Sequence, residues 1–534
     1  MIGAFQRNKT LLFLLIILGI AVFFRLWQID SIPPGLYPDE AINGNDAISA
    51  LKTGNFKVFY PDNNGREGLF INLIALSFGI FSISIWSLKI VGALIGIFTV
   101  LGLYLLTREL FNKNVALLSS FFLAISFWHI NFSRIGFRGI LAPFILVFAF
   151  YFLLRGFKTK NVWNFIISGI FFGLGFYTYI SFRAAVLILI VVLILKLIEY
   201  FSQNLPQKKW EWFWNKMYIQ DGWWKVGLFL LVIILVAIPI GVYFLQNPGD
   251  FISRATGVSI FSAQNPIKAF GESLILHLGM FNFYGDSNWR HNFSGSPMLF
   301  WPIGILFWIG FILIVKDLVK SIKNKNFVSH QLLVASFLIS WFCIMILPGI
   351  LTYEGIPHAL RVIGVIPVVY IFVGLGGWYV YKWFDQNIRS KKLLVLTSLF
   401  FLFAMGFLQF DKYFIKWGGH SEVEGAFSKN YVEIGNYLNS LPAEAQKYVI
   451  VNEMGVPLYG ISIPAQTPIF IEIVKFGQPR STYLRAEDLN QIKTDQREIV
   501  IVPLYDGRLL DKLNQKFPQG QIKREKGFWV YEIR

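Results

Sequence analysis

The sequence predicts a mainly α-helical protein that crosses a membrane many times and ends in a small α/β domain. The 534 residues are 55% hydrophobic and only 15% charged, and their mean hydropathy is +0.55. Apolar stretches long enough to cross a hydrocarbon core of about 30 Å recur over residues 1–410. They lack the short alternating pattern of outer-membrane barrel strands, so the expected spans are helices.

The N-terminal stretch LLFLLIILGIAVFF follows Arg7 and Lys9. A cleaved signal peptide has a similar order of basic and apolar residues, but no small-residue cleavage site follows this stretch. We therefore expect an uncleaved membrane anchor.

Eleven stretches are expected to span the membrane. They cover residues 11–29, 90–107, 114–130, 139–155, 162–180, 184–200, 226–245, 298–315, 331–351, 361–381 and 393–410. The stretch 68–86 is a candidate twelfth span. If it does not span and the N-terminus is cytoplasmic, the loops rich in Lys and Arg face the cytoplasm, as the positive-inside rule requires. If it spans, every later loop changes sides, so we favour eleven spans, with 68–86 as a juxtamembrane or half-inserted helix on the outer side.

The net charge of +17 is assigned to these cytoplasmic loops, so no nucleic-acid partner is expected. The single cysteine, Cys343, lies in an apolar run, which excludes disulfide bonds within the chain and a thiolate metal site. The sequence therefore indicates a multi-pass protein of the inner or plasma membrane, surrounded by membrane lipids.

This topology divides the chain into a membrane domain, 1–410, and a soluble domain, 411–534. The first outer loop, 30–88, and the large outer loop, 246–297, share the outer side with the soluble domain. Apolar periodicity within the soluble domain predicts two helices and three strands. These are helices at 430–441 and 506–517 and strands at 447–452, 497–504 and 527–534.

An adjacent pair of acids, Asp39 and Glu40, stands in the first outer loop within PPGLYPDEAINGNDA. Proline and glycine stiffen the turn before it. A helix is expected at 40–51, so one interpretation is that Asp39 only caps that helix. The other is that Asp39 is a reactive carboxylate, because the charged pair Arg66-Glu67 follows in the same loop.

The remaining outer loops carry several basic residues. A single arginine beside a membrane usually extends to the lipid headgroups. Several of them on the same side as carboxylates indicate instead an anionic ligand at the interface, such as a lipid phosphate. The residues are Arg134, Arg138, Arg290, His291, His358 and Arg361, with Asp286 and Glu354 among them.

A sugar carried on a lipid phosphate fits this set of residues. Its transfer needs little proton donation to the leaving group, because a phosphate monoester leaves readily. It does need cations that stabilise the developing charge, and one carboxylate that accepts the proton of the acceptor hydroxyl. Nucleotide sugars would favour a cytoplasmic site, where no comparable acidic pair stands.

The same stretches resemble a known family. PDEAINGNDA, LYLLTRELFNKNVALLSSFFLAISFWHINFSR, GLGFYTYISFR and PHALRVIGVIP are similar to the bacterial relatives of the protein O-mannosyltransferases. That superfamily includes the lipid A aminoarabinose transferases and has the GT-C fold. The resemblance covers about residues 1 to 410 and is strongest up to 190.

The resemblance implies a membrane glycosyltransferase that uses polyprenyl-phosphate sugars and inverts the anomeric centre. It implies that Asp39, beside Glu40, is the general base and that Arg66 and Glu67 are the charged pair of the first outer loop. The residues expected to hold the phosphate and sugar of the donor are Arg66, Glu67, Arg134, Arg138, His358 and Arg361. The soluble domain departs from the mannosyltransferase type, so protein, lipid and glycan acceptors all stay open.

No cofactor or metal is expected, because the mannosyltransferase-like branch needs none. Oligosaccharyltransferases of the same fold do use a divalent ion held by acids, and the first outer loop offers such acids. They are Asp39, Glu40, Asp46, Asp62 and Glu67.

Three other functions remain as alternatives. One is an oligosaccharide ligase with a lipid-diphosphate donor, although loop 246–297 offers few cations for a diphosphate. Another is a polytopic transporter or flippase, but such proteins carry charges at mid-membrane, and these spans are nearly free of charge. The last is a non-catalytic membrane assembly protein.

Overall fold

The computed structural model describes residues 2–204, 222–324, 329–458, 460–494, 498–505 and 507–533. Within it the chain forms two compact units, each built from several segments. Unit 1 contains Met1–Trp27, Gly92–Arg134 and Arg138–Ile415, and unit 2 contains Gln28–Val91, Ile135–Phe137 and Lys416–Arg534. The first outer loop and the C-terminal segment therefore lie in the same unit.

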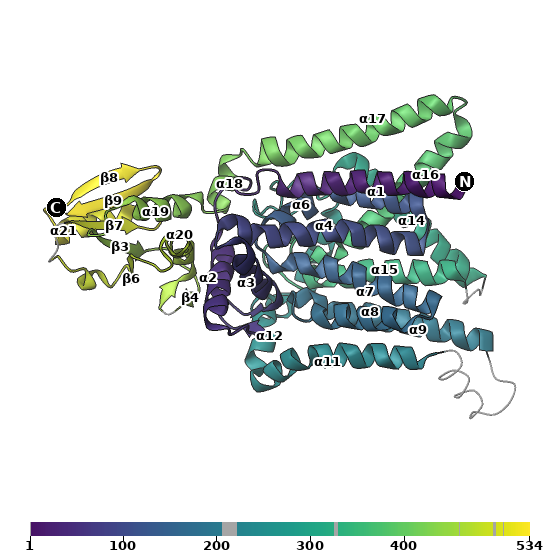
Figure 1. Cartoon of the computed structure of the whole chain (residues 1–534), viewed down its shortest axis with the longest axis horizontal. Coiled ribbons are helices and arrows are strands. Elements are labelled where there is room, and N and C mark those ends of the chain that lie inside the picture. Colours follow the sequence, from purple (N-terminus) through teal and green to yellow (C-terminus); the bar gives the residue numbers. More distant parts are fainter. Residues whose placement is uncertain are drawn as a thin grey trace. The chain divides into compact units, whose positions relative to one another are not determined.

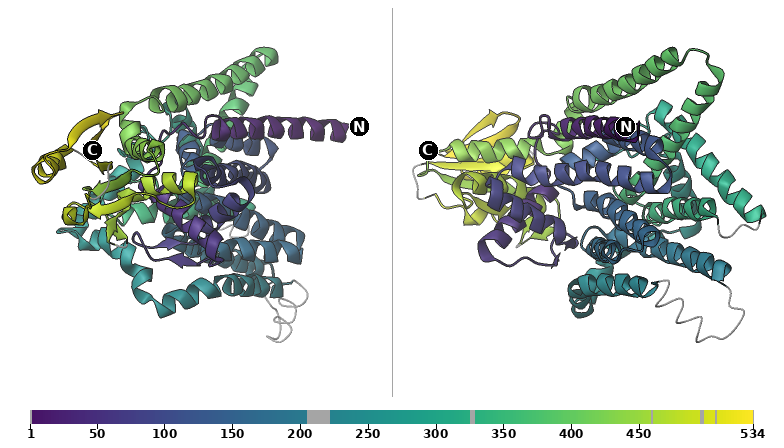
Figure 2. Two further views of the ribbon diagram at one scale, coloured as in Figure 1. Left: turned by 60° about the vertical axis from the view of Figure 1, so that its left-hand side comes forward. Right: turned by 45° about the vertical axis from the view of Figure 1, so that its right-hand side comes forward.

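Unit 1 is a bundle of long apolar helices, whose backbone groups are satisfied within each helix as a lipid environment requires. The helices are α1 (Ile2–Leu26), α4 (Ile85–Leu110, which begins in unit 2), α5 (Lys113–Ala124), α6 (Phe127–Arg134), α7 (Leu141–Thr159), α8 (Val162–Gly175), α9 (Ala185–Asn204), α11 (Trp224–Gln246), α12 (Pro248–Val258), α13 (Pro266–Gly279), α14 (Trp301–Lys323), α15 (His330–Ile350), α16 (Ile366–Asn387) and α17 (Lys391–Phe410). Most of the long helices run roughly parallel to one another (Figure 1), and α16 turns back into α17 as an open hairpin (Figure 2).

Small residues let α14 and α16 approach closely. A Cβ atom at Gly310 would lie 1.9 Å from the backbone oxygen of Phe372, and one at Gly376 would lie 2.0 Å from that of Leu306. Close backbone packing at small residues is typical of helices in membranes.

Nine helices within the described residues are long and apolar enough to cross a membrane, or ten if the bent pair α5 and α6 forms one span. The bent pair, with an angle of 57°, occupies the expected span 114–130. The expected span 162–180 forms α8, whose 14 residues reach only about 21 Å as a helix. The chain is thus a multi-pass membrane protein, and its described residues contain fewer long spans than the eleven expected.

The apolar stretch 68–86 forms α3 (Leu69–Phe81) in unit 2. Its 13 residues extend about 20 Å, less than the hydrocarbon thickness. The length agrees with a helix that does not span. The side of the membrane on which it lies stays a prediction.

A five-stranded sheet forms the C-terminal part of unit 2, in the order β6-β3-β7-β9-β8. Strand β3 pairs in parallel with β6 and β7, and β9 pairs antiparallel with β7 and β8. The strands are β3 (Gln446–Val451), β6 (Thr482–Arg485), β7 (Ile499–Pro503), β8 (Gln521–Glu525) and β9 (Phe528–Ile533), and a separate pair is β4 (Pro457–Leu458) and β5 (Ile461–Ser462). Three strands match the expected ones, and residues 497, 506 and 534 of the expected elements lie outside the described residues.

Helices cover both faces of this sheet because side chains alternate along each strand. Val449 packs with Ile434 of α19 on one face, and Ile450 packs with Leu513 of α21 on the other. The helices that pack on the sheet are α19 (Lys429–Ser440), α20 (Gln466–Phe476) and α21 (Leu510–Lys516), and the short helix α18 (Ser421–Ala426) precedes α19.

Helix α20 also packs against the first outer loop, where it meets α2 (Pro38–Thr53). A Cβ atom at Gly44 would lie 2.6 Å from the ring of Phe470, and the hydroxyl of Thr467 donates to the backbone oxygen of Leu36 (3.0 Å). The C-terminal segment thus supports the helix that carries Asp39 and Glu40. The hairpin of β1 (Phe59–Tyr60) and β2 (Arg66–Glu67) completes this part of unit 2.

Candidate functional site

Asp39 is the second residue of α2 and does not cap the helix. Tyr37 is the N-cap residue, in an extended conformation, and Pro38 takes the first helical position, where its missing N–H is tolerated. The carboxylate of Asp39 is half-buried, and its Oδ1 accepts a hydrogen bond from Nδ2 of Asn63 (2.8 Å). The capping interpretation of Asp39 is therefore wrong.

Glu40 is the third residue of α2, and its carboxylate, not that of Asp39, bonds the backbone at the helix start. Its side chain is 0% exposed. Oε2 accepts the N–H of Tyr37 (3.1 Å) and Oε1 accepts the N–H of Gly136 (2.7 Å). Burial raises the pKa of Glu40, and the positive charge of Lys89 opposes that rise. Glu40 thus fastens the start of α2 to the segment 135–137.

Arg66 fixes the loop that carries Asn63. Its guanidinium is 1% exposed and donates to Asp46 Oδ2 (2.5 Å), Asn43 Oδ1 (2.9 Å) and the backbone oxygen of Asp62 (3.2 Å). Burial raises the pKa of Asp46, and the charge of Arg66 acts in the opposite direction. Arg66 therefore compensates the partly buried carboxylate of Asp46 in its own unit.

The turn between β1 and β2 has the backbone geometry that its residues favour. Asn63, Asn64 and Gly65 all have positive φ, of 54°, 61° and 81°, and asparagine and glycine tolerate this region best. The bond from Arg66 to Asp62 holds the same turn. Glu67, the partner of Arg66 in the predicted pair, is buried beside it.

Arg134, in unit 1, lies at the end of α1. Its guanidinium is 0% exposed and donates to the backbone oxygens of Phe24 (3.1 Å) and Trp27 (2.8 Å). It also stacks on Phe414, with 5.1 Å from Cζ to the ring centre. A cation at the C-terminus of a helix stabilises the last carbonyls, so the contacts of Arg134 are those of a structural residue.

The other predicted donor residues of unit 1 are Arg138, His358 and Arg361. Arg138 lies over the ring of Tyr179, 5.5 Å from its centre. Nη1 of Arg361 donates to Oγ1 of Thr352 (2.8 Å) and to the backbone oxygen of Glu354 (2.6 Å). Arg361 and His358 stand in one loop between α15 and α16.

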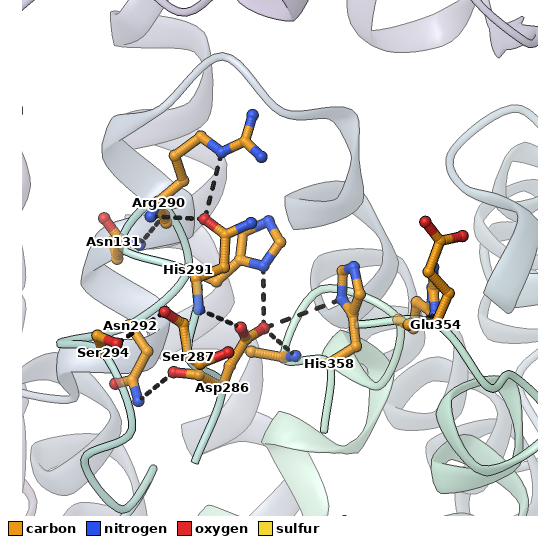
Figure 3. A network of polar contacts seen from close by, with 12 residues as sticks. Asn131, Asp286, Ser287, Arg290, His291, Asn292, Ser294, Glu354 and His358 are labelled. Carbon is orange, nitrogen blue, oxygen red and sulfur yellow. Dashed lines mark hydrogen bonds and ion pairs between the residues drawn. The ribbon is translucent and has the colours of Figure 1, made fainter. Parts of the chain in front are cut away.

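His358 lies beside Asp286, which comes from the loop between α13 and α14. Oδ2 of Asp286 accepts from Nδ1 of His291 (2.9 Å) and from the N–H of Ala359 (2.7 Å), and it lies 4.0 Å from Nδ1 of His358. Figure 3 shows Asp286 between the two imidazole rings. Sequence reasoning noted Asp286 and His291 but did not place them with His358, because 67 residues or more separate the two segments.

Asp286, His291 and His358 have ligand atoms that could together hold a metal ion. They are the group of this kind in the described part of the chain. The acids of the first outer loop form no such group in the described residues. Their oxygens are directed to separate partners, such as Asn63 for Asp39 and Arg66 for Asp46.

Comparisons with known proteins agree with this architecture. Residues 69–213 match the family model described as dolichyl-phosphate-mannose-protein mannosyltransferase. ArnT from Cupriavidus metallidurans, bound to undecaprenyl phosphate, is similar in structure, with a TM-score of 0.57 and 12% identity over 98% of each chain. A search of curated protein sequences finds no match.

The same ArnT in its apo state has a TM-score of 0.57 and 11% identity, over 99% of this chain and 98% of that one. The oligosaccharyltransferase of Archaeoglobus fulgidus, tethered to an acceptor peptide, has a TM-score of 0.50 and 14% identity. That match covers 90% of this chain and 64% of the oligosaccharyltransferase.

The chain therefore has the GT-C fold, the architecture of a superfamily of membrane glycosyltransferases, as the sequence resemblance predicts. Within that superfamily, the family model that matches part of the chain is the mannosyltransferase one.

Proposed function

We propose that the chain is an inverting membrane glycosyltransferase that moves a sugar from a polyprenyl phosphate to a hydroxyl of a protein, lipid or glycan. The observation that carries this proposal is the carboxylate of Asp39. It is half-buried, does not cap the helix and forms no ion pair with the described residues, in a chain with the GT-C fold. Its neighbours Glu40 and Asp46 are each held by partners of their own.

The reaction needs one base and one leaving group. The acceptor oxygen attacks the anomeric carbon from the face opposite the phosphate, and the carbon–oxygen bond to the phosphate breaks. The electron pair of that bond leaves with the polyprenyl phosphate, and the hydroxyl proton passes to Asp39. A positioned base of this kind contributes about 10²- to 10⁴-fold in rate.

The surroundings of Asp39 suit an ionised base. The carboxylate stands in the first turn of α2, where the helix dipole favours negative charge. Asn63 orients one oxygen, and Arg66 orders the turn that carries Asn63. Glu40 and Arg66 thus act as positioning residues.

We assign the donor phosphate to Arg138, His358 and Arg361. Guanidinium and imidazolium groups form charge-assisted hydrogen bonds with phosphate oxygens. Arg134 differs from these three, because it is fully buried and its guanidinium serves the end of α1. We propose a scaffolding role for Arg134, and the same for Arg66 and Glu67.

The test is donor consumption by the purified protein in lipid nanodiscs. The protein is incubated with a panel of polyprenyl-phosphate sugars, with candidate protein, lipid and glycan acceptors, and released polyprenyl phosphate is measured. Release from one donor, with an inverted product, is the expected result. Release from lipid-diphosphate donors alone would instead identify an oligosaccharide ligase.

The side of the membrane is tested by thiol labelling. In a Cys343→Ser background, single cysteines at Asp62 and Arg480 are exposed to a membrane-impermeant maleimide applied to intact cells. We expect both to react from outside. Protection of both positions until the cells are opened would reverse the orientation.

A further inference from the structure

Two loops of unit 1 meet at Asp286. The loop between α13 and α14 folds on its own backbone, because the N–H of Gly295 donates to the oxygen of Asp286 (3.0 Å) and that of Gly285 to the oxygen of Gly295 (3.1 Å). The loop between α15 and α16 joins it through the N–H of Ala359, which donates to the carboxylate of Asp286 (2.7 Å). One buried carboxylate therefore connects both loops.

Two imidazoles stand beside that buried carboxylate. Asp286 is 2% exposed, and its ion-pair partners within the described residues are His291 and His358. A cation or a metal ion stabilises a carboxylate that is buried away from water. The arrangement of one carboxylate and two imidazoles therefore suits a bound cation.

The ligand atoms have the spacing of a small metal site. Oδ2 of Asp286 lies 2.9 Å from Nδ1 of His291 and 4.0 Å from Nδ1 of His358, and all three ligand atoms lie within 4.8 Å of one another. Tetrahedral zinc with ligands at about 2.0–2.1 Å requires ligand atoms about 3.3–3.4 Å apart. The distances from Oδ2 of Asp286 to the two imidazole nitrogens lie on either side of that value.

The carboxylate is oriented before any ion binds. Oδ1 of Asp286 accepts the N–H of Asn288 (2.8 Å), and Oδ2 accepts that of Ala359. His291 packs against the ring of Phe132, with 5.6 Å between ring centres. His277 supports the other loop, because its Nε2 accepts the N–H of His358 (3.2 Å) and its Nδ1 donates to the oxygen of Ser273 (2.8 Å). Such surrounding contacts hold metal ligands in place.

We propose that Asp286, His291 and His358 bind one Zn²⁺ ion, which joins the two loops. Two imidazoles and one carboxylate are a typical zinc ligand set, whereas Mg²⁺ and Ca²⁺ prefer oxygen ligands. The ion takes the place of the proton between His291 and Asp286. Three protein ligands leave a fourth position for water or an anionic oxygen. This site departs from the expectation that the chain holds no metal. His358 then acts on the donor phosphate through the bound ion.

The test is metal binding by the full chain in nanodiscs, with any affinity tag removed. The protein is stripped with a chelator, dialysed against Zn²⁺, and analysed by mass spectrometry for bound zinc. Replacement by Co²⁺ gives a visible absorption band that reports imidazole coordination. We expect one zinc per chain for the wild type.

Asp286→Asn and His358→Gln keep the shape of the side chains and should lower zinc affinity by at least about tenfold. His330→Ala is the matched control, because His330 is exposed and lies at the start of α15, outside the cluster. It should bind zinc as the wild type does.

Two results would overturn the proposal. One is a wild type that binds no zinc above the background of His358→Gln. The other is stoichiometric zinc in both Asp286→Asn and His358→Gln, which would place the ion elsewhere. Neither readout depends on transferase activity, so failure here is distinguishable from failure of the proposed function.

Discussion

Two carboxylates, Glu40 in unit 2 and Asp286 in unit 1, are almost fully buried, but different groups compensate them. Around Glu40 and its neighbour Asp46 stand the fixed positive charges of Lys89 and Arg66. Around Asp286 stand two imidazoles and backbone N–H groups. Fixed cations thus stand beside Glu40 and Asp46, which supports our proposal that Asp39 is the reactive carboxylate of α2. The loops of unit 1 form a site whose charge an exchangeable cation can complete.

The largest expected effect on stability comes from removing the cation that pairs with Asp46. Arg66→Ala should destabilise unit 2 by about 3 kcal/mol, because it leaves Asp46 desolvated without its cation. Arg485→Ala is the control, since Arg485 is 52% exposed in its pair with Asp488, whereas Arg66 is 1% exposed, and pairs of exposed side chains contribute below about 1 kcal/mol. Thermal unfolding followed by intrinsic fluorescence measures both. Equal shifts in Tm would contradict the role given to Arg66.

The next effect concerns donor binding, which we assign to residues of unit 1. Arg361→Ala should weaken donor binding about tenfold, because a charge-assisted hydrogen bond to phosphate contributes on the order of 1.5 kcal/mol, while kcat changes less. Arg138→Ala should act in the same way. Arg389→Ala, an exposed arginine after α16, is the control. Donor titration of the nanodisc protein checks this, and unchanged affinity in both variants would leave them only structural roles.

The smallest effect concerns pH. Burial raises the pKa of Glu40 above its ordinary value of 4.5, so the folded protein retains this proton to higher pH than the unfolded chain. The contribution of Glu40 to the free energy of unfolding is therefore complete below its ordinary pKa. It is lost as the pH rises through the raised pKa of the folded state.

Across that window the Tm of Glu40→Gln should fall less with pH than the Tm of the wild type. Glu422→Gln, at an exposed position of α18, should keep the wild-type slope. Parallel slopes for the wild type and Glu40→Gln would contradict the assignment.

Sequence reasoning found what lies close together along the chain. Asp39, Glu40, Arg66 and Glu67 stand within 29 positions, and composition alone separated the apolar spans from the C-terminal segment that forms the sheet. It did not find that Glu40, not Asp39, bonds the start of α2, because it expected the helix to begin at residue 40 and not at Pro38. The second bond of Glu40, to Gly136, spans 96 positions, and no local pattern records it.

The cluster at Asp286 shows the same limit. His358 and His291 meet only because two loops fold against each other, and no local pattern records that pairing. The short helices α3 and α8 could not be distinguished from spans by hydropathy, since their apolar character is that of a span and only their length differs.

The central claim is that Asp39 is the base. The most direct measurement is the initial rate of polyprenyl-phosphate release, with a donor that the wild type consumes, for Asp39→Asn beside Asp62→Asn. Asparagine keeps the contact with Asn63 but cannot accept the proton, so the rate of Asp39→Asn should fall at least about 10²-fold with unchanged donor affinity and Tm. Asp62→Asn, which replaces another carboxylate of the same loop, should retain most of the wild-type activity. Wild-type turnover in Asp39→Asn would contradict the account.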